Sequence, residues 1–370
     1  MRTENRPEKD MSEDGGRRGV LAACDLPAWA TGTGPWADIV VSTRAAVSRN
    51  LAGLNFPHRA GVATKQRVLE AVIEAAQAAG RHLSTALRPY LATEVSEVER
   101  QALWEAYQVH LDRTPSPDHS ALILSEDRRL CAVVNGEDHV RFTCLLSGLS
   151  TQNACETAAA VADAFGECLE YARHRSLGHL TARPALVGTG MRVSLLAHLA
   201  ALQKLGRLPE ALRSAADVGT ATTSLLPAAG HSHGGLVELS NRRTAGVDAA
   251  EVAASLEETT RHLVTFEQQS RDLLMRERRQ EMVDETWRAL ATLRHARLLS
   301  SAEALAHLST LRLGAGLGIV RGLDARAINR LSLLAAPGLL QTRVGRALPE
   351  SERRSLRAKI VRASLKPKST

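Results

Sequence analysis

Few aromatic residues and no long apolar run set the first limits on this chain. Its 370 residues include four tryptophans, three tyrosines and four phenylalanines. No apolar run approaches the roughly 20 residues that a membrane-spanning helix needs. The first eighteen residues are polar and charged and lack the apolar segment of a signal peptide. We therefore expect a cytoplasmic protein with no membrane partner.

Cysteine and histidine patterns do not predict a metal site or a disulfide frame. The five cysteines are odd in number and lack C-x-x-C spacing, which favours reduced, buried thiols. His231 and His233 are two residues apart, but no third ligand lies near them in sequence. We predict no bound metal beyond one that a nucleotide would bring.

Arginine supplies most of the formal charge of +7, which favours phosphate-bearing or acidic partners. A basic helix is predicted over 351–362, with Leu356 and Ile360 on its buried side. No aromatic interleaving or docking motif accompanies it, so nucleic acid is an unlikely partner.

Length and pattern predict an α+β domain followed by a helical one. We expect a flexible leader over 1–34, a mixed domain over 35–268 and an all-α domain over 269–370. Neighbouring strands joined by short turns, 122–124 with 130–134 and then 140–146, predict an antiparallel sheet flanked by helices. Further strands are predicted at 39–41, 220–226 and 236–239, and helices at 65–88, 94–111, 151–174 and from 248 onward. Pro89 is interpreted as a helix stop, and Asp248 with Glu251 and Ser300 with Glu303 as N-terminal capping pairs.

A charged turn between two apolar runs is the first candidate site. It holds Asn135, Glu137, Asp138, His139 and Arg141, and chemistry is commonly placed where a sheet gives way to a loop. Further along, 188–190 is a Gly-Thr-Gly segment followed by an arginine, which could approach a phosphate but by itself is typical of an ordinary turn.

Several motifs, in this order, resemble those of the phosphagen (guanidino) kinase superfamily, and specifically the McsB-type bacterial protein-arginine kinases. The resemblance covers roughly residues 36 to 365. It is carried by Ser42-Thr43-Arg44, Asn135-x-Glu137-Asp138-His139-x-Arg141, Leu180-Thr181, Gly188-Thr189-Gly190-x-Arg192, Leu239-Ser240-Asn241, Arg312-Leu313-Gly314 and Leu339-Leu340-Gln341.

The resemblance implies a phosphoryl transfer from Mg-ATP to a guanidinium nitrogen of a protein arginine. It implies that Arg44, Arg141 and Arg192, with Ser42 and Thr43, bind the nucleotide. It also implies that Glu137 is one of two carboxylates that hold the acceptor guanidinium, and that the helical domain mediates homodimerisation. Catalysis of this kind depends mostly on positioning and on stabilising charge.

The chain departs from the family motifs at positions that the resemblance implies bind the nucleotide or hold the acceptor guanidinium. The second arginine of the first motif is Ala46, and the first glutamate of the second is Gly136. In the last motif an arginine becomes Thr223 and the second catalytic glutamate becomes Ala228. Losing one such contact typically costs on the order of 3 kcal/mol of transition-state stabilisation. We therefore predict weakened ATP binding and a lost or strongly reduced kinase rate.

Arg183 stands where the family has a cysteine. A fixed cation there would meet Glu137, so we hypothesise that Arg183 pairs with Glu137 and blocks the acceptor site. The sequence alone gives equal weight to the alternative, in which Arg183 points to solvent.

The C-terminal helix carries a variant of the family's phosphoarginine-binding motif. It contains Arg353, Arg354, Arg357 and Ala358, and Arg354 replaces an aspartate. An arginine at that position can pair only with phosphate, so anions remain candidate ligands while selectivity for phosphoarginine is expected to fall.

Three functions follow from these observations. The first is a pseudokinase with a regulatory or scaffolding role. Its expected partners are arginine-containing or arginine-phosphorylated proteins and an intact kinase paralogue. The second is an active protein-arginine kinase with a rearranged site, which uses Glu137 alone or a histidine from His231 or His233 as base. The third is a basic module that binds nucleic acid or phosphoproteins.

Overall fold

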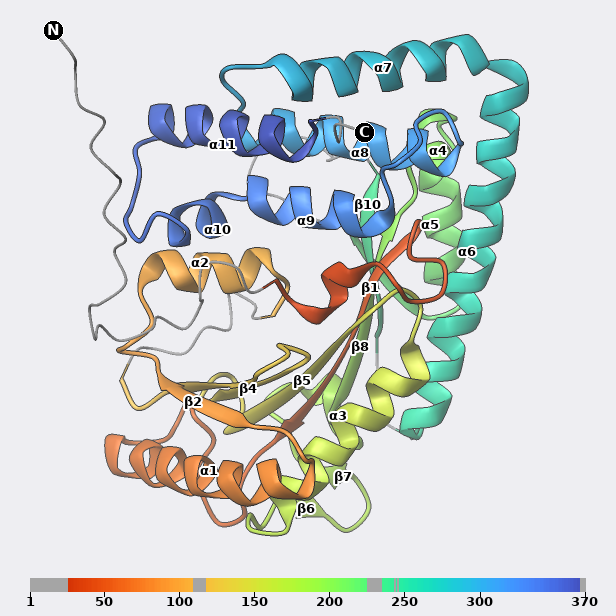
Figure 1. Ribbon diagram of the computed structural model, residues 1–370. Coiled ribbons are helices and arrows are strands. Elements are labelled where there is room, and N and C mark those ends of the chain that lie inside the picture. Colours follow the sequence, from red (N-terminus) through yellow and green to blue (C-terminus); the bar gives the residue numbers. More distant parts are fainter. Residues whose placement is uncertain (1–25, 109–117, 225–234, 243, 245, 367–370) are drawn as a thin grey trace, which may run out of the picture.

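An eight-stranded antiparallel sheet forms the centre of the computed structural model (Figure 1). The structure describes residues 26–108, 118–224, 235–242, 244 and 246–366. The strand order is β2-β3-β4-β5-β1-β8-β10-β9. The strands are β1 (Val40–Arg49), β2 (Leu87–Leu91), β3 (Ala121–Ser125), β4 (Leu130–Val134), β5 (Val140–Ser147), β8 (Met191–His198), β9 (Thr220–Ser224) and β10 (Leu236–Asn241). The predicted antiparallel, helix-flanked sheet is confirmed.

One face of the sheet packs against three long helices. These are α1 (Val62–His82), α3 (Thr151–Gly166) and α6 (Ala249–Glu277), and in Figure 1 α1 and α3 lie below the sheet. The strands contribute alternate apolar residues to this core, including Val47, Phe142 and Val193, which are fully buried.

The other face is covered by helices from both ends of the chain. They are η1 (Ala28–Thr31), α2 (Glu97–Glu105), α9 (Ala325–Ala335) and α10 (Pro337–Thr342). Leu333 of α9 and Leu339 of α10 pack with Val133, Leu145 and Leu196 of the sheet. The C-terminal helices therefore complete the core of the sheet domain.

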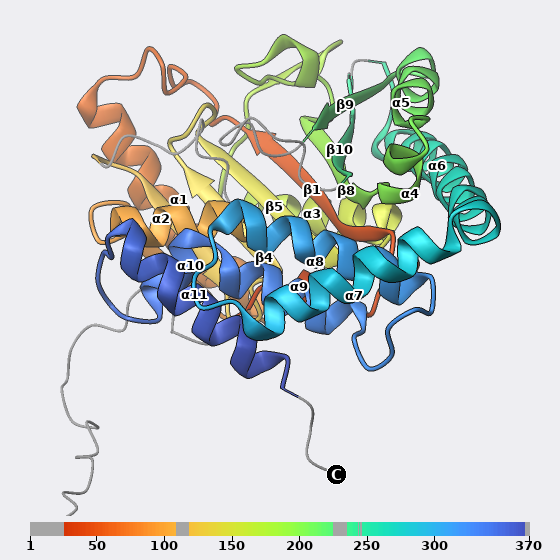
Figure 2. The same ribbon diagram turned by 90° about the horizontal axis from the view of Figure 1, so that it is seen from above.

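The remaining C-terminal helices stack outward from this layer in Figure 1, and in Figure 2 they lie in front of the sheet. They are α7 (Arg279–His295), α8 (Ser301–Gly316) and α11 (Glu350–Ser364), which enclose a separate apolar core with α9. Helix α6 runs unbroken through the boundary expected at 268/269 and leads into α7. The smaller elements are α4 (Ala200–Lys204), α5 (Leu208–Asp217), η3 (Pro184–Leu186), β6 (Arg173–His174) and β7 (Gly178–His179).

The predicted helix caps are present as full capping boxes. The side chain of Asp248 accepts from Glu251 N, and that of Ser300 accepts from Glu303 N. Each satisfies one of the free amides at a helix N-terminus. A further capping box at Ser96 begins α2.

Several element boundaries differ from the predictions. Helix α1 ends at His82, and Pro89 lies inside β2, the edge strand, where a missing amide is tolerated. Helix α2 is shorter than the predicted 94–111, and α3 ends at Gly166, before the β6–β7 hairpin. Within the expected leader, residues 28–31 form η1 because Trp29 is buried and its indole donates to Ala106 O. Residues 1–25 lie outside the described part of the chain.

Three cysteines, Cys131, Cys144 and Cys155, are buried free thiols, whereas Cys168 is exposed. Within the described ranges no helix is both long and apolar enough to cross a membrane.

Candidate functional site

Three arginines share one face of the sheet. In β1 the side chains of Arg44, Ala46 and Ser48 alternate onto the face covered by α9 and α10, and residues directly opposite on neighbouring strands share that face. Ala46 lies opposite Arg192 of β8, and Ser48 lies opposite Arg141 of β5. Strand periodicity therefore places the arginines in a row along β1.

Thr43 lies apart from this row. Its hydroxyl donates to Gly148 O (2.6 Å) and accepts from Ser150 N (3.0 Å), on the other face of the sheet. The side chain is fully buried and ties β1 to the start of α3. A direct contact with a nucleotide is therefore not supported for this hydroxyl.

A carboxylate that the motif comparison missed neutralises Arg44. Glu238 of β10 lies 2.7 Å from the Arg44 guanidinium, and the two side chains are 13% and 10% exposed. Glu238 occupies the position two residues before Ser240, so the period of β10 could have placed it on the arginine face. Its partner across β9 is Thr223, a position where the resemblance implies an arginine.

Arg192 lies beside this pair. Its guanidinium donates to Ser240 Oγ (3.0 Å). The pKa of Arg192 is lowered, mainly by burial. The negative charge of Glu238 raises this pKa, and the positive charges of Arg44 and Arg183 lower it further. Three positive groups, Arg44, Arg192 and Arg183, therefore lie in succession, with Glu238 beside the first.

The charged turn between β4 and β5 is mostly scaffolding. Asn135 has a left-handed backbone (φ 55°), and its amide donates to Lys65 O and His119 O. His139 is buried, accepts from Leu51 N through Nδ1 and so donates to Asn55 O through Nε2. Burial of this neutral ring lowers its pKa.

Asp138 fastens the turn to the segment before η3. Its Oδ1 accepts from the Asn50 side chain and from Ala182 N, each at 2.7 Å. The neighbouring residues on both segments then meet, because Arg183 Nε donates to Glu137 Oε1 at 2.6 Å. The hypothesised Arg183–Glu137 ion pair is therefore present.

The Gly-Thr-Gly segment is a backbone turn. Gly188 and Gly190 have φ angles of 115° and 68°, and their amides donate to His179 O and Leu186 O. A Cβ on Gly190 would lie 2.6 Å from Ser48 O, so only glycine fits against β1 there. Neither glycine amide is available to a phosphate.

A cavity of about 360 Å³ adjoins the row at Arg44. Its floor includes Ser42, Arg44 and Ser194 of the sheet. Its walls come largely from η1, α2, α8 and α9, with Tyr107 just after α2 and Leu196 of β8. Aromatic and aliphatic side chains dominate the lining, among them Trp29, Trp104, Leu305 and Leu308. A cavity with a few polar groups on apolar walls is typical of a small-molecule site.

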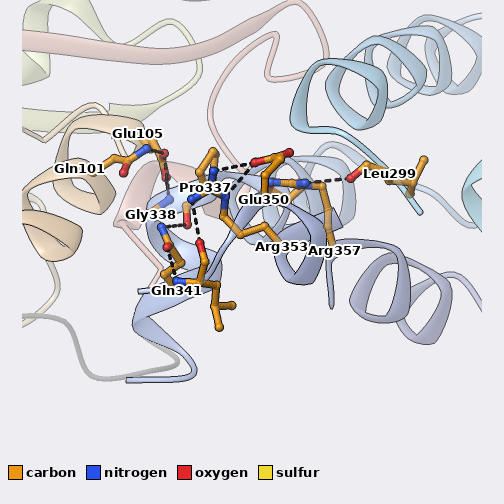
Figure 3. Close-up of polar contacts among 11 residues, drawn as sticks. Gln101, Glu105, Leu299, Pro337, Gly338, Gln341, Glu350, Arg353 and Arg357 are labelled. Atoms are coloured by element: carbon orange, nitrogen blue, oxygen red, sulfur yellow. Dashed lines mark hydrogen bonds and ion pairs between the residues drawn. The ribbon is translucent and has the colours of Figure 1, made fainter. Parts of the chain in front are cut away.

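The C-terminal motif is largely occupied within the fold (Figure 3). Arg357 is fully buried and donates to Ala335 O (2.6 Å) and Leu299 O (2.8 Å). Arg353 pairs with Glu350 (2.6 Å), while Arg354 is exposed. The buried residues of α11 are therefore Arg357, Ala358 and Val361. The prediction that Leu356 and Ile360 form the buried side is wrong. Arg357 can be buried because two carbonyl groups accept hydrogen bonds from its guanidinium. Anion binding at this motif stays a prediction.

Some predicted positions cannot be placed. Ala228, His231 and His233 lie outside the described residues. Among the residues that are described, no group of three or more histidine, cysteine or acidic side chains could hold a metal ion.

Two family models together match most of the chain. Residues 67–270 match the ATP:guanido phosphotransferase C-terminal catalytic domain, and residues 279–370 match the protein-arginine kinase McsB C-terminal domain. The chain belongs to the protein-arginine kinase family.

Relatives in this family are similar over nearly their whole length. The protein-arginine kinase of Moorella thermoacetica is 36% identical over 338 residues, which cover 91% of this chain and 97% of that protein. The protein-arginine kinase of Symbiobacterium thermophilum is 36% identical over 345 residues, covering 91% and 96%.

Solved structures show the same fold. Lombricine kinase matches with a TM-score of 0.55 at 18% identity, over 68% of this chain and 71% of that one. The duplicated taurocyamine kinase from Schistosoma mansoni, with bound transition state analog components, matches with a TM-score of 0.53 at 20% identity, over 66% and 35%.

The family's nucleotide, ATP with Mg, fits this protein-arginine kinase family member only in part. Arg141 and Arg192, which are expected to bind phosphates, share the face of Arg44, but Arg44 is already paired with Glu238. Glu137, the carboxylate expected to hold the acceptor guanidinium, is likewise paired.

Proposed function

We propose that this protein-arginine kinase family member no longer phosphorylates arginine in other proteins and acts as a nucleotide-responsive regulator or scaffold. The observation that carries the proposal is the Arg183–Glu137 ion pair. A guanidinium from the chain itself contacts the carboxylate that would hold a substrate guanidinium.

The Arg183–Glu137 pair hinders substrate binding more than it stabilises the fold. Its side chains are 40% and 33% exposed, so solvent screens their attraction and the pair contributes little to folding. An incoming arginine must nevertheless displace a tethered competitor, and tethering gives that competitor a high effective concentration. Asp138 holds Ala182, the residue before Arg183, so the competitor is also positioned.

The losses around the pair support the same conclusion. Ala46 leaves a gap in the arginine row beside Arg192, and Thr223 lies opposite Glu238 where a further arginine is implied. Each missing charge is worth on the order of 3 kcal/mol in such a site, although losses in one unit do not add.

Nucleotide binding is expected to persist in weakened form. The cavity beside Ser42 and Arg44 would take the nucleoside, and the row toward Arg192 and Arg141 would meet phosphates. We further propose a homodimer formed through the C-terminal helices, an intact kinase paralogue as partner, and arginine-containing or arginine-phosphorylated proteins as clients.

The test measures transfer and acceptor binding separately. Purified protein is incubated with γ-labelled ATP and an arginine-rich protein, and acid-labile label is scored. We expect none. Binding of a fluorescent arginine-containing peptide should improve at least tenfold in Arg183→Ala and should disappear again in the Arg183→Ala, Glu137→Gln double variant.

Arg175→Ala is the matched control, because Arg175 is an exposed arginine only eight residues before Arg183 in the chain. It should leave peptide binding unchanged. Acid-labile label in the wild type that is lost in Glu137→Gln would instead support the active kinase with a rearranged site.

A further inference from the structure

We infer that Glu238 sets the ligand class of the cavity, so that the site takes a nucleoside, or a similarly uncharged planar ring compound, in preference to a nucleoside triphosphate. This inference rests on the proposed nucleotide cavity and deepens it. Nothing in the family comparison assigns a role to Glu238.

The first argument is the position of the carboxylate. Glu238 Oε1 lies 2.7 Å from Arg44 Nη2, and both residues line the cavity. The side chains are only 13% and 10% exposed, so water screens them weakly. A phosphate that approached Arg44 would have to displace Glu238 or lie beside a like charge.

The second argument is the charge of the whole cavity wall. Its arginines are Arg44 and Arg312, and its carboxylates are Glu105 and Glu238, so positive and negative residues are equal in number. Arg312 already donates to Ala37 O and Asn329 Oδ1, and Glu105 accepts from the amides of Gly338 and Leu339. Both arginines of the cavity are therefore already engaged by groups of the chain, and a polyphosphate would have to displace those partners.

The third argument is the character of the walls. Trp29, Trp104 and Tyr107 present aromatic rings, and Leu196 and Leu305 add aliphatic surface. Trp29 and Tyr107 already pack edge to face, with ring centroids 5.6 Å apart. Such surroundings favour a flat, weakly polar ring.

Glu238 could instead act as a ligand for the magnesium ion of Mg-ATP. That role has the opposite consequence: removing the carboxylate would weaken Mg-ATP binding. If Glu238 instead keeps phosphate away from Arg44, removing the carboxylate frees Arg44 and strengthens ATP binding. One substitution therefore separates the two roles.

The experiment compares adenosine, AMP, ADP and ATP, with and without Mg²⁺, by isothermal titration calorimetry on the full-length protein. In the wild type, adenosine should bind at least tenfold more tightly than ATP, a difference of about 1.4 kcal/mol. In Glu238→Gln, which preserves shape, ATP affinity should rise at least tenfold while adenosine affinity changes less than twofold. Glu258→Gln, at an exposed glutamate of α6, should change neither affinity.

Other results would overturn the inference. Wild-type binding of ATP as tight as, or tighter than, adenosine would show that Glu238 does not disfavour phosphate, and weaker Mg-ATP binding by Glu238→Gln would show a metal-ligand role. Absence of binding by every compound would remove the nucleotide cavity itself, while the acceptor-peptide result above would stand. Circular dichroism checks folding, and Glu238→Ala serves as a second variant if the glutamine variant misfolds.

Discussion

At the scale of single residues, neighbouring charged side chains in the β4–β5 turn have different tasks. Asp138 and His139 are buried and hydrogen-bonded to backbone and amide groups, whereas Glu137 reaches the surface and pairs with Arg183. The buried pair of residues builds the turn, whereas the surface pair is the one that we propose controls acceptor binding. The structural members of a motif can therefore be read from burial and hydrogen bonds separately from the member proposed to act in chemistry.

Asp138→Asn should destabilise the protein by about 1 to 2 kcal/mol, because the two donors that bond Oδ1 would keep an acceptor oxygen but lose its negative charge. Its present partners are Asn50 Nδ2 and Ala182 N. Urea unfolding measures the change. Asp272→Asn, at an exposed position of α6, is the control and should stay within about 0.5 kcal/mol of the wild type. Equal effects in the two variants would contradict the structural role.

At the scale of elements, the contact between α2 and α10 joins the sheet region to the C-terminal helices (Figure 3). Glu105 of α2 accepts from Gly338 N (2.7 Å) and Leu339 N (3.2 Å) at the start of α10. A Cβ on Gly338 would lie 2.5 Å from Ala102 N, so the two helices meet at backbone distance. Burial raises the pKa of Glu105 to about 7, despite these amide donors.

This raised pKa predicts a pH-dependent contribution to stability. The folded protein holds the proton more tightly than the unfolded chain, so the contribution is complete below about pH 4.5 and is lost as pH rises through about 7. Glu105→Gln keeps an acceptor oxygen but does not titrate. Between pH 5 and pH 8 the variant should gain about 2 kcal/mol of stability relative to the wild type.

Urea unfolding of the two proteins across this pH range provides the measurement. A difference that does not vary with pH would show that Glu105 titrates normally. Glu97→Gln, at an exposed residue in the first turn of α2, controls for the removal of charge alone.

At the scale of the whole molecule, the C-terminal helices share an apolar core with the sheet. Leu333 and Leu339 pack directly on sheet residues Leu145 and Leu196, over the face that carries the arginines. The cavity lies between these layers and takes walls from both. A ligand in the cavity would therefore contact the catalytic-domain sheet and the McsB-type helices at once.

Leu333→Ala should consequently destabilise the entire chain by about 2 to 5 kcal/mol, the range typical of a buried leucine. The side chain is 3% exposed. Calorimetry and far-ultraviolet circular dichroism should show one transition, shifted to lower temperature in the variant. Leu298→Ala, at an exposed leucine, should have little effect. Two separate transitions, with only one shifted, would contradict a shared core.

The sequence alone determined the family and the order of the site motifs. The alternation of β1 is local, so Arg44, Ala46 and Ser48 could be assigned to one face without coordinates. Capping boxes at Asp248 and Ser300 are also local signals, since both partners lie within one turn of helix. The end of α1 was not predictable in this way, because an edge strand accepts Pro89 as readily as a helix end does.

Only the tertiary structure decided which charges meet. Glu238 and Arg44 are 194 residues apart in sequence, and strand order brings β10 and β1 to either side of β8. The Arg183–Glu137 contact joins two segments that are distant in sequence. Asp138 brings them together, because it accepts a hydrogen bond from the backbone amide of Ala182. Arg357 was expected in a ligand motif, yet packing of α11 buries it against two carbonyls. Residue identity supplies the charge, but the path of the chain selects the partner that neutralises it.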